Sequence, residues 1–329
     1  MRVASLLPSA TEILCLVGGA SLLVGRSHEC DHPAGLDHLS VLTSARTALG
    51  VKPGAAREVD RLVRQDRDAE DSLYVLDTET LEALRPDIIL TQDLCDVCAI
   101  HLPAVEAAAR AIAASTGRTP AVVTLRPETP EDVYDDCLRI GEVIGRTADA
   151  TRAVAALRER FFAAADIVAT FGPAPVVGFL EWTDPLFIAG HWNVQLIERA
   201  GGRHPLNETV AKHQAGAAIG PMQSERVAGR SIAVPPEVFA ATAPEALVIA
   251  PCGLDLAQTR RVAAELAENA WFVDLPAVRT GRVALVNGNQ MFNRPGPRLV
   301  DAFEWLVAWL HDRPDRMPAG FPWEPMDLR

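Results

Sequence analysis

The stretch RVASLLPSATEIL at residues 2–14 decides the plan of this chain, because a short apolar run breaks at Pro8 and then resumes as a helix. The plan returns in the second half as PVVGFLEW at residues 175–182, and HWNVQLIERAGG follows at residues 191–202. Each half therefore opens with a buried strand, and the loop ahead of the next helix carries polar residues. Two such halves facing each other form a cleft, which is where we expect the function to reside.

Composition limits the classes of protein to consider. The chain has 329 residues, enough for two domains of ordinary size. A net charge of −12 argues against a nucleic-acid partner, which needs a basic surface. No run approaches the ~20 apolar residues of a membrane span, so we expect no membrane insertion. The first strand follows the N-terminal methionine at once, which predicts a cytoplasmic protein as written, or a periplasmic or surface-anchored one if a leader was removed.

Strand and helix signals alternate along both halves, which favours an α/β fold with mostly parallel sheets covered by helices. Strands are predicted at residues 3–7, 22–24, 41–43, 88–91, 121–125, 175–180, 247–250, 271–274 and 283–286. Helices are predicted at residues 11–17, 81–84, 102–114, 129–144, 193–200, 236–241, 256–268 and 298–311, with a charged surface helix in 57–71.

One helix is long enough to join two domains. Apolar residues three or four apart predict a helix from Thr147 to about Thr170, which spans roughly 35 Å. The expected organisation is an N-terminal α/β lobe at 1–146, a connecting helix at 147–172 and a C-terminal α/β lobe at 173–329. The last lobe ends in a proline-rich tail that is predicted to pack as an extended strap.

Several motifs resemble the helical-backbone class of substrate-binding proteins, which serve ABC importers of cobalamin, haem and ferric siderophores. The resemblance implies two Rossmann-like lobes joined by a single long helix, and its nearest branch binds cobalamin and includes a group without an export signal. The motifs are PSATE at 8–12, VGRSHECDHP at 24–33, LRPDII at 84–89, GHW at 190–192, AGG at 200–202, PEALVI at 244–249 and RPGPR at 294–298.

Loops at the carboxyl ends of parallel strands line the ligand crevice of such folds, so their side chains are the candidate ligand-binding residues. Tryptophans suit a corrinoid or a related metal chelate, which presents a broad apolar face, and His191 is a candidate ligand of cobalt or iron. The alternative is that the tryptophans pack the core and His191 bonds a nearby carbonyl. The candidates are Pro8, Ser9, His28, Glu181, Trp182, Asp184, His191, Trp192, Phe292 and Arg294.

Cysteines raise a second possibility. Cys95 and Cys98 have the spacing of a metal-chelating pair, and Cys30 with His28 could complete a zinc or iron site, with Cys252 as a further sulfur. The alternative is that these cysteines are small apolar packers. A metal-dependent enzyme or factor in the same cleft is thus the alternative function, although no nucleophile elbow, phosphate loop or HExxH motif is present. A regulatory domain that closes on a metabolite also stays open.

Partners follow from the resemblance. In importer-linked relatives, acidic residues of the two lobes dock onto arginines of the membrane subunit, so Glu12 and Glu198 are the candidate contacts with an ABC permease. The alternative is that both are ordinary solvated acids.

Overall fold

The structure is a computed structural model that describes residues 1–46, 56–61, 74–93, 100–168, 173–212 and 226–327. These residues fall into two compact units. The first holds 1–46, 61, 74–93, 100–127 and 131–156, and the second holds 56–60, 128–130, 157–168, 173–212 and 226–327. In the described part of the chain, no helix combines the length and apolarity that crossing a membrane requires.

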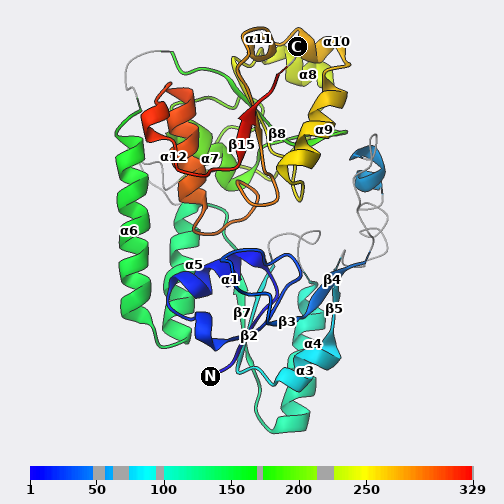
Figure 1. Cartoon of the computed structure of the whole chain (residues 1–329), viewed down its shortest axis with the longest axis vertical. Helices are drawn as coiled ribbons and strands as arrows, with labels where there is room; N and C mark the ends of the chain where they lie inside the picture. Colours follow the sequence, from blue (N-terminus) through cyan, green and yellow to red (C-terminus); the bar gives the residue numbers. More distant parts are fainter. Residues whose placement is uncertain (47–55, 62–73, 94–99, 169–172, 213–225, 328–329) are drawn as a thin grey trace. The chain divides into compact units, whose positions relative to one another are not determined.

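The described residues of the first unit contain a parallel sheet with strand order β3-β2-β1-β6-β7. Strands β2, β3 and β7 of this sheet are labelled in Figure 1. A separate antiparallel pair joins β4 to β5. The strands are β1 (Val3–Ser5), β2 (Leu23–Arg26), β3 (Ser40–Val41), β4 (Thr43–Ala45), β5 (Tyr74–Leu76), β6 (Ile88–Gln92) and β7 (Ala121–Leu125). The helices are α1 (Pro8–Leu16), the 3-10 helix η1 (Ala20–Leu22), α3 (Thr78–Leu84), α4 (Leu102–Thr116), α5 (Pro130–Val143) and the first part of α6 (Thr147–Ala165).

Local signals explain where these helices begin and end. Proline fixes φ near the helical value, and Pro8 is the first residue of α1. The Asp77 side chain accepts a hydrogen bond from the Thr80 amide at 2.9 Å and so caps α3, which ends where Arg85 takes a left-handed φ of 45°. Buried apolar side chains of the sheet, of α3 and of α4 then form one core, which includes Ala4, Leu6, Leu81, Ile89, Val105 and Ile112.

Within the described residues of the second unit, a mixed sheet has the strand order β12-β9-β8-β13-β14-β15. Strands β8 (Val177–Thr183), β13 (Ala246–Ile249) and β14 (Val283–Val286) are parallel, while β9 (Leu186–Ile188), β12 (Ile232–Ala233) and β15 (Trp323–Pro325) run antiparallel to their neighbours. A short pair joins β10 (Val210–Ala211) to β11 (Arg226–Val227). The helices are α7 (His191–Arg199), α8 (Pro236–Ala241), α9 (Leu256–Leu266), α10 (Ala270–Val273), α11 (Pro276–Arg279), α12 (Leu299–Leu310) and η2 (Pro314–Arg316).

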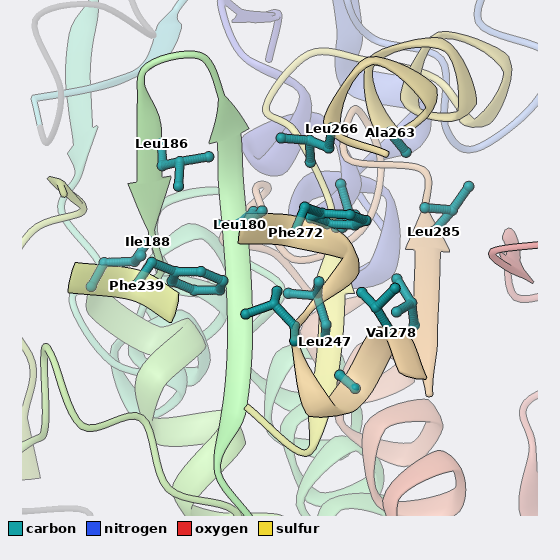
Figure 2. Packing of buried hydrophobic residues seen from close by; sticks show 14 residues of the cluster. Leu180, Leu186, Ile188, Phe239, Leu247, Ala263, Leu266, Phe272, Val278 and Leu285 are labelled. Atoms are coloured by element: carbon teal, nitrogen blue, oxygen red, sulfur yellow. The ribbon is translucent and has the colours of Figure 1, made fainter. Parts of the chain in front are cut away.

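The core of the second unit lies against β8, β13 and β14, whose apolar side chains gather with those of the short helices (Figure 2). Leu180, Leu247 and Leu285 come from the three strands, and Phe239 and Phe272 come from α8 and α10. Burying a side chain of this size contributes about 1.5–3 kcal/mol, so this cluster fixes the three parallel strands whose carboxyl ends carry the candidate residues.

The structure confirms the predicted α/β class and several elements, among them β7, β14 and α8 with their predicted bounds. One predicted strand is wrong: residues 271–274 lie in and beside the helix α10. Short apolar runs do not distinguish a strand from a buried helical turn, and here Trp271 and Phe272 pack edge-on with Phe239 nearby. The predicted strand at 41–43 is divided between β3 and β4, and α6 ends at Ala165.

Candidate functional site

In the first unit, the carboxyl end of β1 leads into a buried polar cluster beneath α1. Thr11 Oγ1 donates to Ser5 Oγ at 2.8 Å, and Ser5 Oγ donates to the Leu7 carbonyl at 3.1 Å. Cys30 Sγ lies 3.1 Å from Thr11 Oγ1 and is buried. The thiol of Cys30 is thus part of the packing that holds the turn between β1 and α1.

His28 stands on the loop that follows β2. Its amide donates to Thr43 Oγ1 at 3.1 Å, and its Nδ1 lies 2.7 Å from the same oxygen. Because Thr43 Oγ1 donates its proton to Ser27 Oγ at 2.9 Å, the His28 Nδ1 carries the hydrogen and Nε2 keeps its lone pair. Burial lowers the pKa of His28, an effect that Glu29 opposes and Arg26 reinforces. His28 is therefore a neutral imidazole near pH 7.

A small hollow adjoins His28. Its walls include Leu6, Pro8, Thr43 and Tyr74. The Tyr74 ring lies 5.4 Å from the His28 ring, and its hydroxyl donates to Glu29 Oε1 at 2.9 Å. Pro8 is half-buried at this hollow, whereas Ser9 is 3% exposed. Of these two predicted contact residues, only Pro8 has a side chain at the surface.

In the second unit, Glu181 near the end of β8 carries a carboxylate that accepts three hydrogen bonds from the protein. Oε1 accepts from the Gly190 amide at 3.2 Å and from Asn193 Nδ2 at 2.8 Å, and Oε2 accepts from Ser231 Oγ. Loss of solvation raises the pKa of Glu181, while these three hydrogen bonds oppose the rise. The carboxylate predicted to contact a ligand instead ties together parts of the protein.

His191 is the first residue of α7. It has a left-handed φ of 49°, which is unfavourable for a residue with a side chain. Its ring stacks on Trp192 with 5.5 Å between centroids, and burial lowers its pKa, with Glu128 opposing this and Arg230 adding to it. Within the described residues neither ring nitrogen has a hydrogen-bond partner, and the residue is half-buried. A neutral imidazole with this geometry has a lone pair available to bind a metal.

Trp192 and Phe292 contact each other within the protein. Trp192 is 7% exposed, and its indole donates to the Phe292 carbonyl at 2.6 Å. Phe292 is 1% exposed, since its ring packs edge-on against Phe179 and Trp305. The expectation that Phe292 contacts a ligand is therefore corrected: its ring belongs to the core. Arg294 is also buried, at 7% exposure.

Trp182 and Asp184 are held by a segment that the sequence did not associate with them. The Trp182 indole donates to the carbonyls of Ala56 at 3.2 Å and Asp184 at 3.1 Å. Arg57 forms a two-pronged ion pair with the Asp184 carboxylate, with distances of 3.1 and 3.2 Å. Residues 56–61 are helical, and within the second unit they pack through Ala56 and Val59.

The predicted cysteine cluster stays a prediction. Cys95 and Cys98 lie outside the described residues, and among the described ones no group of three or more His, Cys, Asp or Glu side chains is placed to hold a metal ion. Cys252 is exposed, and its amide donates to the Glu181 carbonyl at 3.0 Å.

Neither predicted docking acid is a simple exposed carboxylate. Glu12 is only 4% exposed within α1, which corrects the expectation that it presents a charge to a partner. Glu198 is half-buried near the end of α7, where its carboxylate accepts from the Thr209 amide at 2.8 Å and from the Thr209 hydroxyl.

Five participants were missed by sequence reasoning: Ala56, Arg57, Thr43, Asn193 and Ser231. Asn193 lies two residues after His191 in the first turn of the predicted helix, and this nearness to a candidate residue was the signal that could have found it. Ser231 and Ala56 come from distant stretches, and no local pattern connects them with Glu181 or Trp182.

Both units thus place polar and aromatic side chains at the carboxyl ends of parallel strands, which is the arrangement of a ligand-binding protein. A family described as periplasmic binding protein matches residues 3–289, and the chain belongs to this family. Members of the family are substrate-binding proteins that take small-molecule ligands and work with ABC transporter permeases; they are not enzymes. The enzyme alternative is set aside on this ground. No curated protein matches the chain.

Three solved structures illustrate the fold. A periplasmic heme-binding protein from Pseudomonas aeruginosa is 22% identical, with a TM-score of 0.63 and coverage of 99% of this chain and 95% of that one. The periplasmic heme-binding protein RhuT from Roseiflexus sp. RS-1 is 20% identical, with a TM-score of 0.63 and coverage of 95% and 98%. The periplasmic vitamin B12 binding protein BtuF of Vibrio cholerae is 18% identical, with a TM-score of 0.61 and coverage of 95% and 97%.

Proposed function

We propose that this protein binds a corrinoid or a related tetrapyrrole metal chelate, and that His191 is the residue that coordinates the metal of the cargo. One observation carries the proposal. His191 presents a half-buried, neutral imidazole whose two ring nitrogens have no protein partner among the described residues, on a strained backbone at the start of α7. Neither nitrogen is among the buried unpaired atoms of the described residues, so the ring is accessible for a bond that the protein itself does not supply.

The surroundings of His191 suit such a cargo. Trp192 supports one face of the imidazole, so the ring is held in a fixed orientation. Arg230 and Glu128 lie close enough to influence its pKa, and both are exposed. An arginine beside the ring can pair with a carboxylate or amide edge of a macrocycle.

The comparisons support the class of cargo rather than its identity. Two of the similar structures are named for heme and one for vitamin B12. Both molecules are macrocycles that hold a metal with axial positions open to a protein ligand, and histidine is one of the side chains that fill them. A shared chemistry of this kind explains why an available imidazole is the informative feature.

Titration with hydroxocobalamin and, separately, with hemin tests the proposal. Wild-type protein is expected to shift the visible spectrum of at least one of the two at a 1:1 ratio, because an imidazole changes the axial ligand field of the metal. His191→Ala is expected to lose that shift. His38→Ala is the matched control, since His38 is exposed and its Nδ1 lies 2.9 Å from the Gly35 carbonyl oxygen within the first unit. No spectral change with either chelate for the wild-type protein overturns the proposal.

A further inference from the structure

We infer that Glu181 is a positioning residue, which holds the first turn of α7 so that His191 faces its ligand. The inference rests on the proposed function, because it assigns the role of Glu181 through His191. It replaces the expectation that the Glu181 carboxylate touches the ligand directly, since all of its hydrogen-bonding capacity that the structure shows is turned toward the protein.

The Glu181 carboxylate accepts hydrogen bonds from parts of the chain that are far apart in sequence. Glu181 joins two other segments to β8. At the start of α7 it accepts from the Gly190 amide and from the side chain of Asn193, the third residue of the helix, and beside β12 it accepts from the Ser231 hydroxyl. Two of these donors flank His191 in sequence. A carboxyl group has about four acceptor sites on its two oxygens, so this one side chain can accept from all three donors at once.

The backbone around Gly190 and His191 is also closely packed. A Cβ at Gly190 would lie 2.1 Å from the Ser231 amide nitrogen, so the two backbone segments are in direct contact. The His191 amide donates to the Gly229 carbonyl at 2.8 Å, and Asn207 Nδ2 donates to the carbonyls of Ala189 at 2.8 Å and Arg230 at 3.1 Å. The backbone on both sides of His191 is thereby clamped.

These contacts on both sides of His191 maintain a strained backbone conformation at this residue. His191 keeps a φ of 49°, a conformation that costs of order 1–3 kcal/mol and persists only where neighbouring contacts impose it. Relaxation of the turn to an ordinary φ would redirect the imidazole. Glu181 is the acceptor that links this strained turn to both β8 and the segment at Ser231, so its loss releases the ring without removing it.

A double-mutant cycle tests the inference, with the affinity for the responding chelate and its spectral shift as readouts. Residues that orient a metal-binding histidine typically contribute 10- to 100-fold to affinity, so Glu181→Ala is expected to weaken binding by about 10- to 100-fold and to reduce the shift. Glu181→Gln keeps an acceptor for Gly190 and Asn193 and is expected to retain most of the affinity. In a His191→Ala background, Glu181→Ala is expected to cost nothing further.

Controls separate the possible failures. Glu198→Ala removes a comparable carboxylate at the other end of α7, where it serves Thr209, and is expected to lower stability while leaving the spectrum unchanged. Should Glu181→Ala not fold, Asn193→Ala removes one of the same bonds and is expected to weaken binding in the same His191-dependent way. Equal affinity of wild type and Glu181→Ala for the chelate, or additive losses in the cycle, overturns the positioning role and leaves the proposed function intact. A wild-type protein that changes the spectrum of neither chelate overturns the proposed function itself.

Discussion

The indole N–H of Trp182 donates to the Ala56 carbonyl at 3.2 Å, so β8 of the second unit is tied to a helical stretch 126 positions earlier in the sequence. The ion pair between Arg57 and Asp184 reinforces this attachment from the neighbouring residues. Because the Arg57 side chain is 80% exposed, the ion pair contributes little, and the indole bond with the burial of Ala56 and Val59 is the stronger part.

Trp182→Phe tests that attachment. The substitution keeps an aromatic ring but removes the donor, so the free energy of unfolding is expected to fall by about 1 kcal/mol. Amide hydrogen exchange at residues 56–61 is expected to become faster, because those residues lose an anchor. Arg57→Ala serves as the comparison and is expected to change both quantities by less. Unchanged exchange in Trp182→Phe would show that the indole bond does not hold the segment.

Ligand coordination through His191 is expected to depend on pH in a direction fixed by its environment. Burial lowers the pKa of His191 below its usual 6.5, so the imidazole stays neutral and able to bind a metal at pH values where a solvated histidine is protonated. Affinity for the chelate should therefore stay constant from pH 8 down to about 6.5 and decline only below that. An affinity that already falls between pH 8 and 7 contradicts the assignment.

Asp136 on α5 is expected to make the folding stability of the protein fall as the pH rises, whereas the affinity at His191 falls as the pH is lowered. Burial raises the pKa of this carboxyl to about 7, against partial relief from Arg139, whose Nη2 donates to Asp136 Oδ1 at 2.6 Å. A raised folded-state pKa means that the native protein holds a proton that the unfolded chain has released, so this residue makes stability fall as pH rises from about 4 to 7.

Asp136→Asn is expected to remove that slope. The gain in the free energy of unfolding at pH 8 is at most on the order of 4 kcal/mol by linkage, and it should vanish near pH 4. Urea unfolding at several pH values measures the difference. Glu142→Gln is the matched control, because Glu142 is an exposed acid of the same helix that is not among the groups acting on Asp136. A gain that is equal at pH 4 and pH 8 would rule out a titrating Asp136 as its source.

Gly190 gives a test of the clamp around His191 that leaves every polar side chain in place. Its φ of −130° suits any residue, but a Cβ would meet the Ser231 backbone at 2.1 Å, so Gly190→Ala forces the two segments apart. We expect the free energy of unfolding to fall by about 1–3 kcal/mol, and the spectral shift of the chelate on binding to be lost. Gly145→Ala, at a left-handed glycine with open space around its Cα, is expected to cost stability alone.

The sequence predicted the parallel strands well because each is a run of apolar residues bounded by turn signals, as in Ala121–Leu125 and Val283–Val286. It failed at residues 271–274, where a short, mostly apolar run carries no period, and it did not predict β9 and β12, since antiparallel strands of two or three residues leave little pattern.

The candidate site was predictable as a set of loops but not as a set of roles. Strand ends pointed to Glu181, His191 and Trp192 correctly as neighbours of one another in the second unit. Which of these side chains forms hydrogen bonds within the protein depends on partners such as Ser231, which lies 50 positions after Glu181 in the sequence. Only the three-dimensional structure distinguishes a carboxylate that bonds to the protein from an imidazole whose nitrogens have no protein partner among the described residues.

The membership of residues 56–60 and 128–130 in the second unit also bears on how the protein can be divided. A recombinant fragment that begins at residue 157 would carry the whole of β8 yet leave the Trp182 indole without its Ala56 acceptor and bare the surface that Ala56 and Val59 cover. Neither half is a contiguous piece of polypeptide, so the gene cannot be cut once to yield two intact folding units.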